Sequence, residues 1–238
     1  MARTNEYGQP IGEPVTDWKP RERHARIGID GKHCRVEPLD VDLHAADLFE
    51  AYGQASDASD WTYLFVGPFA DFDAFRDYLT KAAAAGDPLH YTVIDSASGK
   101  AVGTLALMRI EPAHGVIEMG SVTFSPLLKQ TRLSTEAQYL LMRYVFEDLG
   151  YRRYEWKCDS LNAPSRKTAL RLGFEFEGIF RQAIVYKGRN RDTAWYAIID
   201  RDWPRIRRAF ERWLADDNFD ENGRQRASLA QLRGEDRG

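Results

Sequence analysis

The stretch "DSLNAPSRKTALRLGFEFEG", residues 159–178, decides the fold. Residues 162–173 within it predict a short helix, because a proline stands near the start and Gly173 at the end. The strand-like run "RRYEWKC" at 152–158 precedes this helix, and a long hairpin over 174–200, turning at "KGRN", follows it. A helix between a strand and a hairpin indicates an α/β domain.

The alternation of strands and helices continues towards the N-terminus. We expect a strand, two helices and three strands before the next helix, and one last helix after the hairpin. The predicted elements are a strand at 34–39, helices at 41–54 and 71–86, two strands within 89–110, a strand at 115–126 and a final helix at 203–217. No repeat or low-complexity linker divides them, so residues 27–215 form one predicted domain.

The two ends of the chain have a different composition. Residues 1–26 are rich in proline, glycine and charge and lack apolar periodicity, which predicts an N-terminal arm. Residues 216–238 are similar and predict a flexible C-terminal tail.

The best-defined helix of the sequence follows residues 127–134. Thr135 and Gln138 have the spacing of a capping box, apolar residues then recur at helical spacing, and Gly150 ends the pattern. The segment before it, "LLKQTRLS", has the outline of a phosphate-binding loop but contains no glycine. Such loops usually use glycine to bring the backbone close to the phosphate.

Composition limits the class of protein. A hydrophobic fraction of 43% supports a substantial core, and the net charge of −3 argues against general nucleic-acid binding, although basic clusters occur at 21–26, 187–191 and 205–208. Cys34 and Cys158 lack metal-ligand spacing, which favours two reduced thiols. No apolar run has the length of a membrane span and the N-terminus lacks a secretory signal, so we expect a cytoplasmic protein without a membrane partner.

The order of elements, together with the Asn-x-x-Ser pattern of Asn162 and Ser165 and the Leu-Gly-Phe run ending at Phe174, resembles the GNAT acetyltransferase superfamily and its RimJ/RimL branch. The likeness covers roughly residues 33–200. It implies an α/β GNAT fold with a mixed central sheet of about six or seven strands flanked by helices. It also implies acetyl transfer from acetyl-CoA, as cosubstrate, to an amine, with no metal. Members of this branch often form dimers, so a homodimer is consistent with the resemblance.

The resemblance places the cofactor loop of the family on residues 129–134. Arg132 and Ser134 stand where the family has glycine or another small residue. A helix N-terminus still presents unpaired N–H groups and partial positive charge, and side chains could replace what glycine provides. We therefore expect the hydroxyls of Thr131, Ser134 and Thr135 to donate to a diphosphate and Arg132 to bind a phosphate oxygen. The predicted cofactor ligands are Thr123, Phe124, Ser125, Lys129, Gln130, Thr131, Arg132, Leu133, Ser134, Thr135, Asn162, Ser165 and Arg166.

The resemblance also implies catalytic roles. The strand before the loop supplies backbone donors for the oxyanion at Thr123–Ser125, and Glu118 on the same strand is the leading candidate for the general base. His114 and Glu111 are weaker substitutes. Many relatives protonate the thiolate with a tyrosine, but Ala169 stands at that position. The resemblance to RimL-like members, which use the serine of Asn-x-x-Ser instead, implies this role for Ser165.

The remaining predictions concern cofactor contacts and the acceptor. Asn162 is expected to cap its helix, and Arg166 to reach the nucleotide phosphates. The acceptor pocket in this fold involves the first two helices and the hairpin, which points to residues 60–67 and to side chains of the later strands. Those side chains are Trp156, Arg181, Tyr186 and Trp195.

Three functions fit this sequence. The first is an N-acetyltransferase acting on a small amine, an amino acid derivative or a protein N-terminus. The second is an acyltransferase with another donor, such as aminoacyl-tRNA, which is the one reading that involves nucleic acid. The third is a CoA-binding module without turnover. The match around Asn162 and Ser165 favours the first.

Overall fold

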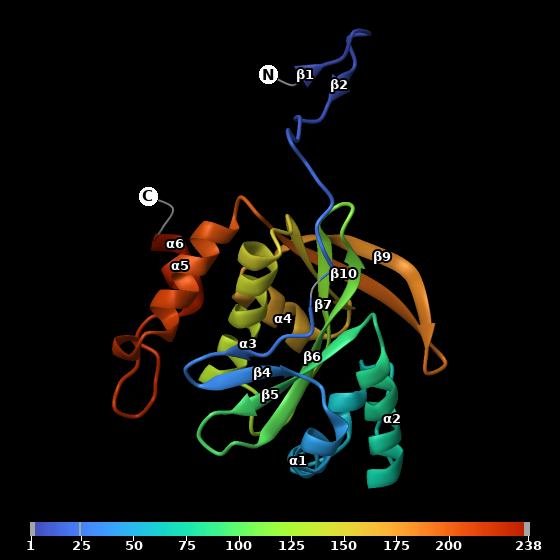
Figure 1. Cartoon of the computed structure of the whole chain (residues 1–238), viewed down its shortest axis with the longest axis vertical. Helices are drawn as coiled ribbons and strands as arrows, with labels where there is room; N and C mark the ends of the chain where they lie inside the picture. The colour runs from blue at the N-terminus through green and yellow to red at the C-terminus, as the bar shows by residue number, and fades with distance from the viewer. Residues whose placement is uncertain (1–2, 24, 236–238) are drawn as a thin grey trace.

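The computed structural model describes residues 3–23 and 25–235. At its centre is an eight-stranded sheet in the order β3-β4-β5-β6-β7-β8-β10-β9 (Figure 1). Its strands are β3 (Ile29–Asp30), β4 (Cys34–Pro38), β5 (Leu89–Asp95), β6 (Ala101–Glu111), β7 (Val116–Phe124), β8 (Arg153–Asp159), β9 (Glu175–Tyr186) and β10 (Arg189–Ile199). The predicted α/β class and mixed sheet are confirmed. The sheet has one strand more than the expected six or seven. The additional strand is β3, which has two residues and is too short to show a periodic pattern in the sequence.

Helices cover both faces of the sheet. α1 (Val41–Gly53) and α2 (Phe72–Ala84), joined through the 3-10 turn η1 (Ser59–Trp61), enclose the smaller core around Leu48, Phe75 and Leu79. α3 (Arg132–Arg143) with its π-helical end η2 (Tyr144–Asp148), α4 (Ala163–Leu172) and α5 (Trp203–Leu214) cover the larger core. None of the described helices is long and apolar enough to cross a bilayer.

Local sequence signals explain where most of the helices begin and end. Asp71 caps α2, which lies within the helix predicted at 71–86, by accepting a hydrogen bond from Ala74 N at 2.9 Å. Asn162 caps α4, and Gly173 ends it with a left-handed φ of 104°. The predicted helix within the deciding stretch is therefore confirmed. α2 ends at Ala84, two residues before the predicted end of this helix at residue 86.

The predicted capping box of α3 is wrong. The helix begins at Arg132, and Thr131 is its cap, accepting a hydrogen bond from Ser134 N at 3.2 Å. Thr135 and Gln138 lie within the helix and are each 2% exposed. Two threonines four residues apart both fit a cap, and only the preceding turn decides between them.

Both ends of the chain contact the domain. The hairpin of β1 (Arg3–Thr4) and β2 (Pro10–Ile11) projects away from the sheet (Figure 1), whereas Trp18 Nε1 donates to Ala113 O at 2.9 Å. At the other end, η3 (Asp216–Asn218) and α6 (Leu229–Glu235) follow α5. Leu229 and Leu232 of the segment predicted as a tail are buried in the larger core.

A buried carboxylate joins α3 to the β3–β4 turn. Glu136 accepts hydrogen bonds from the backbone amides of Lys32, His33 and Cys34 at 2.9, 2.7 and 2.8 Å. Gly31 permits this approach, because a Cβ there would lie 2.8 Å from the Glu136 carboxylate. The first turn of α3 is therefore fixed against the edge of the sheet.

Replacing Glu136 with alanine leaves three amides of this turn without an acceptor. We expect Glu136→Ala to lower the free energy of unfolding by about 3 kcal/mol, measured by urea denaturation. Glu221→Ala, which removes an exposed carboxylate, serves as the control and is expected to change stability by less than about 0.5 kcal/mol. Equal stability of the two variants would contradict the role given to Glu136.

Candidate functional site

The site is organised by the separation of two parallel strands. β7 and β8 pair over four residues, from Val116↔Arg153 to Met119↔Trp156. Beyond that point β7 stays paired with β6, and β8 with β10. The β8-facing backbone of residues 120–124 therefore has no strand partner within the described chain. We call the space between residues 120–124 and residues 157–159 the gap.

A β-bulge shapes the β7 side of the gap. The register with β6 shifts between Thr104 and Ala106, and Ser121 there adopts a left-handed φ of 48°. Bulges turn backbone groups out of the ladder, which supports the expected oxyanion donors near this place. Of those donors, Ser125 is already engaged, since both its N and its Oγ bond to Val102 O. Thr123 and Phe124 remain beside the gap.

Two helix N-termini face this end of the sheet. α3 follows β7 and α4 follows β8, so parallel strands bring both starts to one edge. The amides of Arg132 and Leu133, in the first turn of α3, precede the first intrahelical hydrogen bond. This edge therefore suits an anionic ligand.

The loop before α3 makes its turn without glycine. Gln130 adopts the left-handed φ of 59° that glycine would otherwise provide. Thr131 Oγ1 donates to Leu128 O at 2.6 Å, and Ser134 Oγ donates to Thr131 O at 2.7 Å. These hydroxyls close the helix cap, so they do not project towards a ligand as expected from the sequence. Thr135 is buried and accepts from Arg171 Nη1 at 3.1 Å.

The predicted cationic ligands are engaged elsewhere. Arg132 Nη2 lies 3.0 Å from Asp216 Oδ1, and its guanidinium stacks 4.0 Å over the Phe219 ring, so the structure does not bring it to the gap. Lys129 forms an ion pair with Asp60.

Arg171, which sequence reasoning missed, stands beside the first turn of α3. It stacks 5.0 Å from the Trp213 ring and has no ion pair in the described part of the chain. Burial lowers the pKa of its guanidinium. Its place in the last turn of the predicted 162–173 helix was the only available sequence signal.

Ser165 lies on α4, on the side of the gap that faces the larger core. Its Oγ accepts a hydrogen bond from Trp156 Nε1 at 3.0 Å, while Asn162 Oδ1 accepts from its backbone N at 3.1 Å, which confirms the predicted cap. The hydroxyl also forms a side-chain hydrogen bond to Cys158, so its one proton can go to that sulfur or to a ligand in the gap. Arg166 turns to Tyr196 OH and Ser160 O, at 3.0 and 3.1 Å, and not towards the start of α3.

Glu118 belongs to a buried charge network. Its Oε2 lies 2.9 Å from Lys157 Nζ, which also contacts Glu155 Oε2 at 2.6 Å. Arg109 Nε approaches Glu118 to 3.4 Å. Burial raises the pKa of the Glu118 carboxyl above its ordinary value, and the Lys157 ammonium opposes that rise. Lys157 itself stacks 3.9 Å over the Trp195 ring.

Glu118 and Ser165 lie on opposite faces of the sheet. Ile117, Met119 and Trp156 point into the larger core beneath α3 and α4, where Ser165 bonds Trp156. Glu118 and Lys157 alternate with them and therefore point to the other face. The gap is where groups from both faces can meet one ligand.

The weaker base candidates are far from this gap. Glu111 pairs with Val116 at the start of β7, and His114 lies in the turn between β6 and β7. The gap opens at the other end of β7. Neither residue therefore reaches the site.

The loop of residues 57–67 forms a wall on the Glu118 face. Lys187 Nζ donates to Trp61 O and Gly67 O, each at 2.8 Å, and to Val66 O at 3.2 Å. Tyr63 OH donates to Leu161 O at 3.2 Å, at the end of β8. This loop and the β9–β10 hairpin thus enclose the expected acceptor region.

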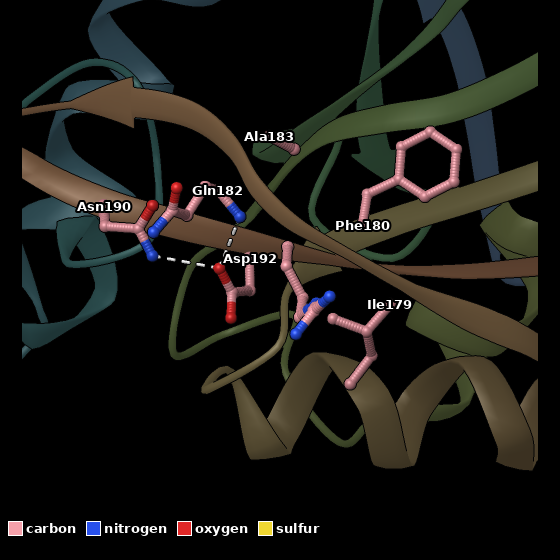
Figure 2. A pocket seen from close by; sticks show the side chains of 7 residues that line it. Ile179, Phe180, Gln182, Ala183, Asn190 and Asp192 are labelled. Carbon is pink, nitrogen blue, oxygen red and sulfur yellow. Dashed lines mark hydrogen bonds between the residues drawn. The ribbon is translucent and has the colours of Figure 1, made fainter.

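An open hollow of about 750 Å³ lies along β9 and β10 (Figure 2). Figure 2 shows Asp192 Oδ1 accepting from Gln182 N and Asn190 Nδ2, at 2.7 and 2.9 Å. None of the predicted cofactor ligands lines this hollow. Arg181, which was predicted for the acceptor pocket, does line it. Within the described residues no three His, Cys, Asp or Glu side chains are grouped to hold a metal.

Comparisons with known proteins agree with this geometry. Residues 34–175 match the model of the acetyltransferase (GNAT) domain family. A GCN5-related N-acetyltransferase from Brucella melitensis has a similar structure, with a TM-score of 0.91 and 48% identity over 92% of this chain and 100% of that one. A probable GNAT-family acetyltransferase from Chromobacterium violaceum has a TM-score of 0.76 and 42% identity, covering 82% and 98%.

Two relatives found by sequence are named as acetyltransferases. An uncharacterized N-acetyltransferase, p20, of Bacillus licheniformis is 26% identical over 68% of this chain and 92% of its own length. The ribosomal-protein-serine acetyltransferase of Escherichia coli (strain K12) is 33% identical over 42% of this chain and 55% of its own length. The family model covers more than half of the sequence, and the resemblance to the RimJ/RimL branch agrees with these relatives. The chain therefore belongs to the GNAT acetyltransferase family.

Proposed function

We propose that this protein transfers an acetyl group from acetyl-CoA to the primary amine of a small molecule, an amino acid derivative or a protein N-terminus. The observation that carries the proposal is the gap between β7 and β8, bordered by the part of β7 that has no β8 partner among the described residues and by the N-termini of α3 and α4. A cytoplasmic location and a homodimer remain predictions.

The residues at the gap fit a nucleotide thioester. Backbone groups of residues 120–124 offer hydrogen bonds to an extended chain that carries amides, and the amides of Arg132 and Leu133 offer positive charge to a diphosphate. Besides Arg132, which pairs with Asp216, the cations near this helix start are Lys129 in the preceding loop and Arg171, which contacts Thr135. When bound, acetyl-CoA supplies the activated acyl group.

The chain's own groups supply the remaining steps. Backbone amides near Thr123 would stabilise the oxyanion, as the bulge at Ser121 favours. Glu118 would take the proton of the amine on one face, directly or through water. Ser165, whose oxygen is held by Trp156, would donate its hydroxyl proton in a hydrogen bond to the departing thiolate on the other face.

CoA binding and thiol release test the proposal. We expect CoA and acetyl-CoA to raise the melting temperature with ligand concentration, and one amine of a broad panel to release free thiol. Ser165→Ala should lower turnover by about 10-fold or more and leave the dissociation constant of CoA unchanged. Thr168→Ala, at an exposed position of the same helix, is the matched control.

Each outcome of this experiment has a distinct meaning. No stabilisation by either ligand at millimolar concentration would remove the CoA reading and leave another donor, such as aminoacyl-tRNA. Stabilisation without thiol release for any amine would favour a binding module. Full activity of Ser165→Ala would exclude the role given to its hydroxyl.

A second prediction concerns pH. If Glu118 is the base, kcat/KM should fall as the pH drops through a pKa higher than that of a free glutamate, because burial favours the protonated form. Glu118→Gln should lower kcat by about 100-fold or more. Lys157→Met should move the acidic limb to higher pH, since the ammonium no longer favours the carboxylate.

Glu111→Gln is the control, because this exposed glutamate lies at the opposite end of β7. Its pH profile should match that of the unmodified protein. An unchanged acidic limb in Lys157→Met would assign that limb to a group other than Glu118.

A further inference from the structure

Arg191 is a buried cation without a carboxylate partner. It is 6% exposed and lies on β10, close to the hairpin turn. Its Nε donates to Thr193 Oγ1 at 3.2 Å, which is the only hydrogen bond of its guanidinium among the described residues. Burial of an arginine is costly unless the charge is compensated, so this position needs an explanation.

Two aromatic rings enclose the guanidinium. It lies 5.1 Å from the Phe65 ring and 5.8 Å from the Tyr186 ring, and those rings are 5.5 Å apart. The acid that is opposite Thr193 in the ladder, Asp159, is already satisfied by Tyr186 OH at 2.7 Å and by Leu161 N at 2.9 Å. Cation–π contact offsets only part of the cost of burial.

The neighbouring cations of the hairpin show a contrast. Lys187 donates to three carbonyls of the 57–67 loop, and Arg189 Nη2 donates to Thr62 O at 2.7 Å. These two residues hold the loop that carries Phe65. The third cation of the run, Arg191, is covered by that loop but has no loop carbonyl as partner. Its role therefore differs from loop attachment.

Arg191 also faces the acceptor side of the sheet. Its Nε bonds Thr193, whose side chain alternates with that of Ala194 in the larger core. Thr193 thus shares a face with Trp195 and with Lys157, which contacts Glu118. This face of β7, β8 and β10 accordingly carries the candidate base, Glu118, on β7 and a guanidinium without an ion pair among the described residues, that of Arg191, on β10.

We propose that Arg191 binds a carboxylate of the acceptor, so that the substrate is an amine that also carries a carboxylate. This inference rests on the proposed function and narrows its acceptor class. The planar fork of Nη1 and Nη2 matches a carboxylate in two parallel hydrogen bonds, and the aromatic enclosure strengthens them by excluding water. A protein N-terminus, as a different class of acceptor, becomes an outcome of the test.

The experiment compares acceptors in matched pairs. Amino acids with different separations of amine and carboxylate are assayed beside their carboxamides, with acetyl-CoA and detection of free thiol. We expect at least one acid to exceed its amide in kcat/KM by about 30-fold or more. In Arg191→Gln this ratio should fall to near one, and in Arg191→Lys, which keeps the charge but loses the fork, to an intermediate value.

Arg189→Gln controls for loop structure. It removes the bond to Thr62 O and loosens the same loop, so it should lower activity on acid and amide alike and keep their ratio. An unchanged dissociation constant for CoA verifies that each variant is folded. If Arg191→Gln does not fold, Arg191→Lys carries the test by the same ratio.

Other results would overturn the inference. Equal use of acids and amides by the unmodified protein, an acid preference that survives in Arg191→Gln, or a preference for peptide N-termini regardless of charge would each exclude it. In all three cases the proposed acetyl transfer stands. Failure to bind acetyl-CoA or to release thiol with any amine would instead remove the proposed function itself.

Discussion

The constraint on which the rest depends is the parting of β7 from β8 after Met119 and Trp156. Each strand remains bonded to its outer neighbour, so neither can move across to close the ladder. Backbone groups inside a protein need partners, and along residues 120–124 the described part of β8 provides none. Because the two strands are parallel, the helices that follow them begin at the same edge. One break in pairing thus assembles hydrogen-bonding groups and positive helix ends in one place.

The same break separates two environments. Side chains alternate across a strand, so Ser165 and Trp156 meet beneath α4, whereas Glu118 and Lys157 meet on the reverse face. The charges around Glu118 are balanced within the network by Lys157, Arg109 and the Glu155–Arg153–Glu177 chain of ion pairs. The Ser165 hydroxyl, in contrast, contacts the uncharged indole N–H of Trp156. The sheet therefore keeps a group suited to accept a proton apart from one suited to donate it.

Much of the fold could be predicted from local sequence, and much of the site could not. Helix α4 was predictable because Asn162, a proline and Gly173 act within a few residues of each other. The start of α3 was misplaced because Thr131 and Thr135 carry the same local signal. The directions of Arg132 and Lys129 depend on Asp216 and Asp60, which are remote in sequence, and no periodicity reveals such pairs. The alternation of Arg153, Glu155 and Lys157 in the sequence indicates a charged strand face. For Arg191 the sequence shows only that it belongs to the basic cluster 187–191, and nothing in it indicates burial.

The pairing of Arg132 with Asp216 and Phe219 affects the kind of anion that the start of α3 can hold. A free arginine there would attract any polyanion over a distance, including nucleic acid, with little regard for shape. With its charge neutralised by the C-terminal segment, the helix start keeps mainly its short-range backbone amides. Affinity then depends on a phosphate group fitting closely against the first turn. A ligand that offers only a high negative charge binds weakly there. If the start of α3 binds the proposed diphosphate, the segment after α5 contributes to the selectivity of that site, although it lies outside the part of the chain that matches the family model.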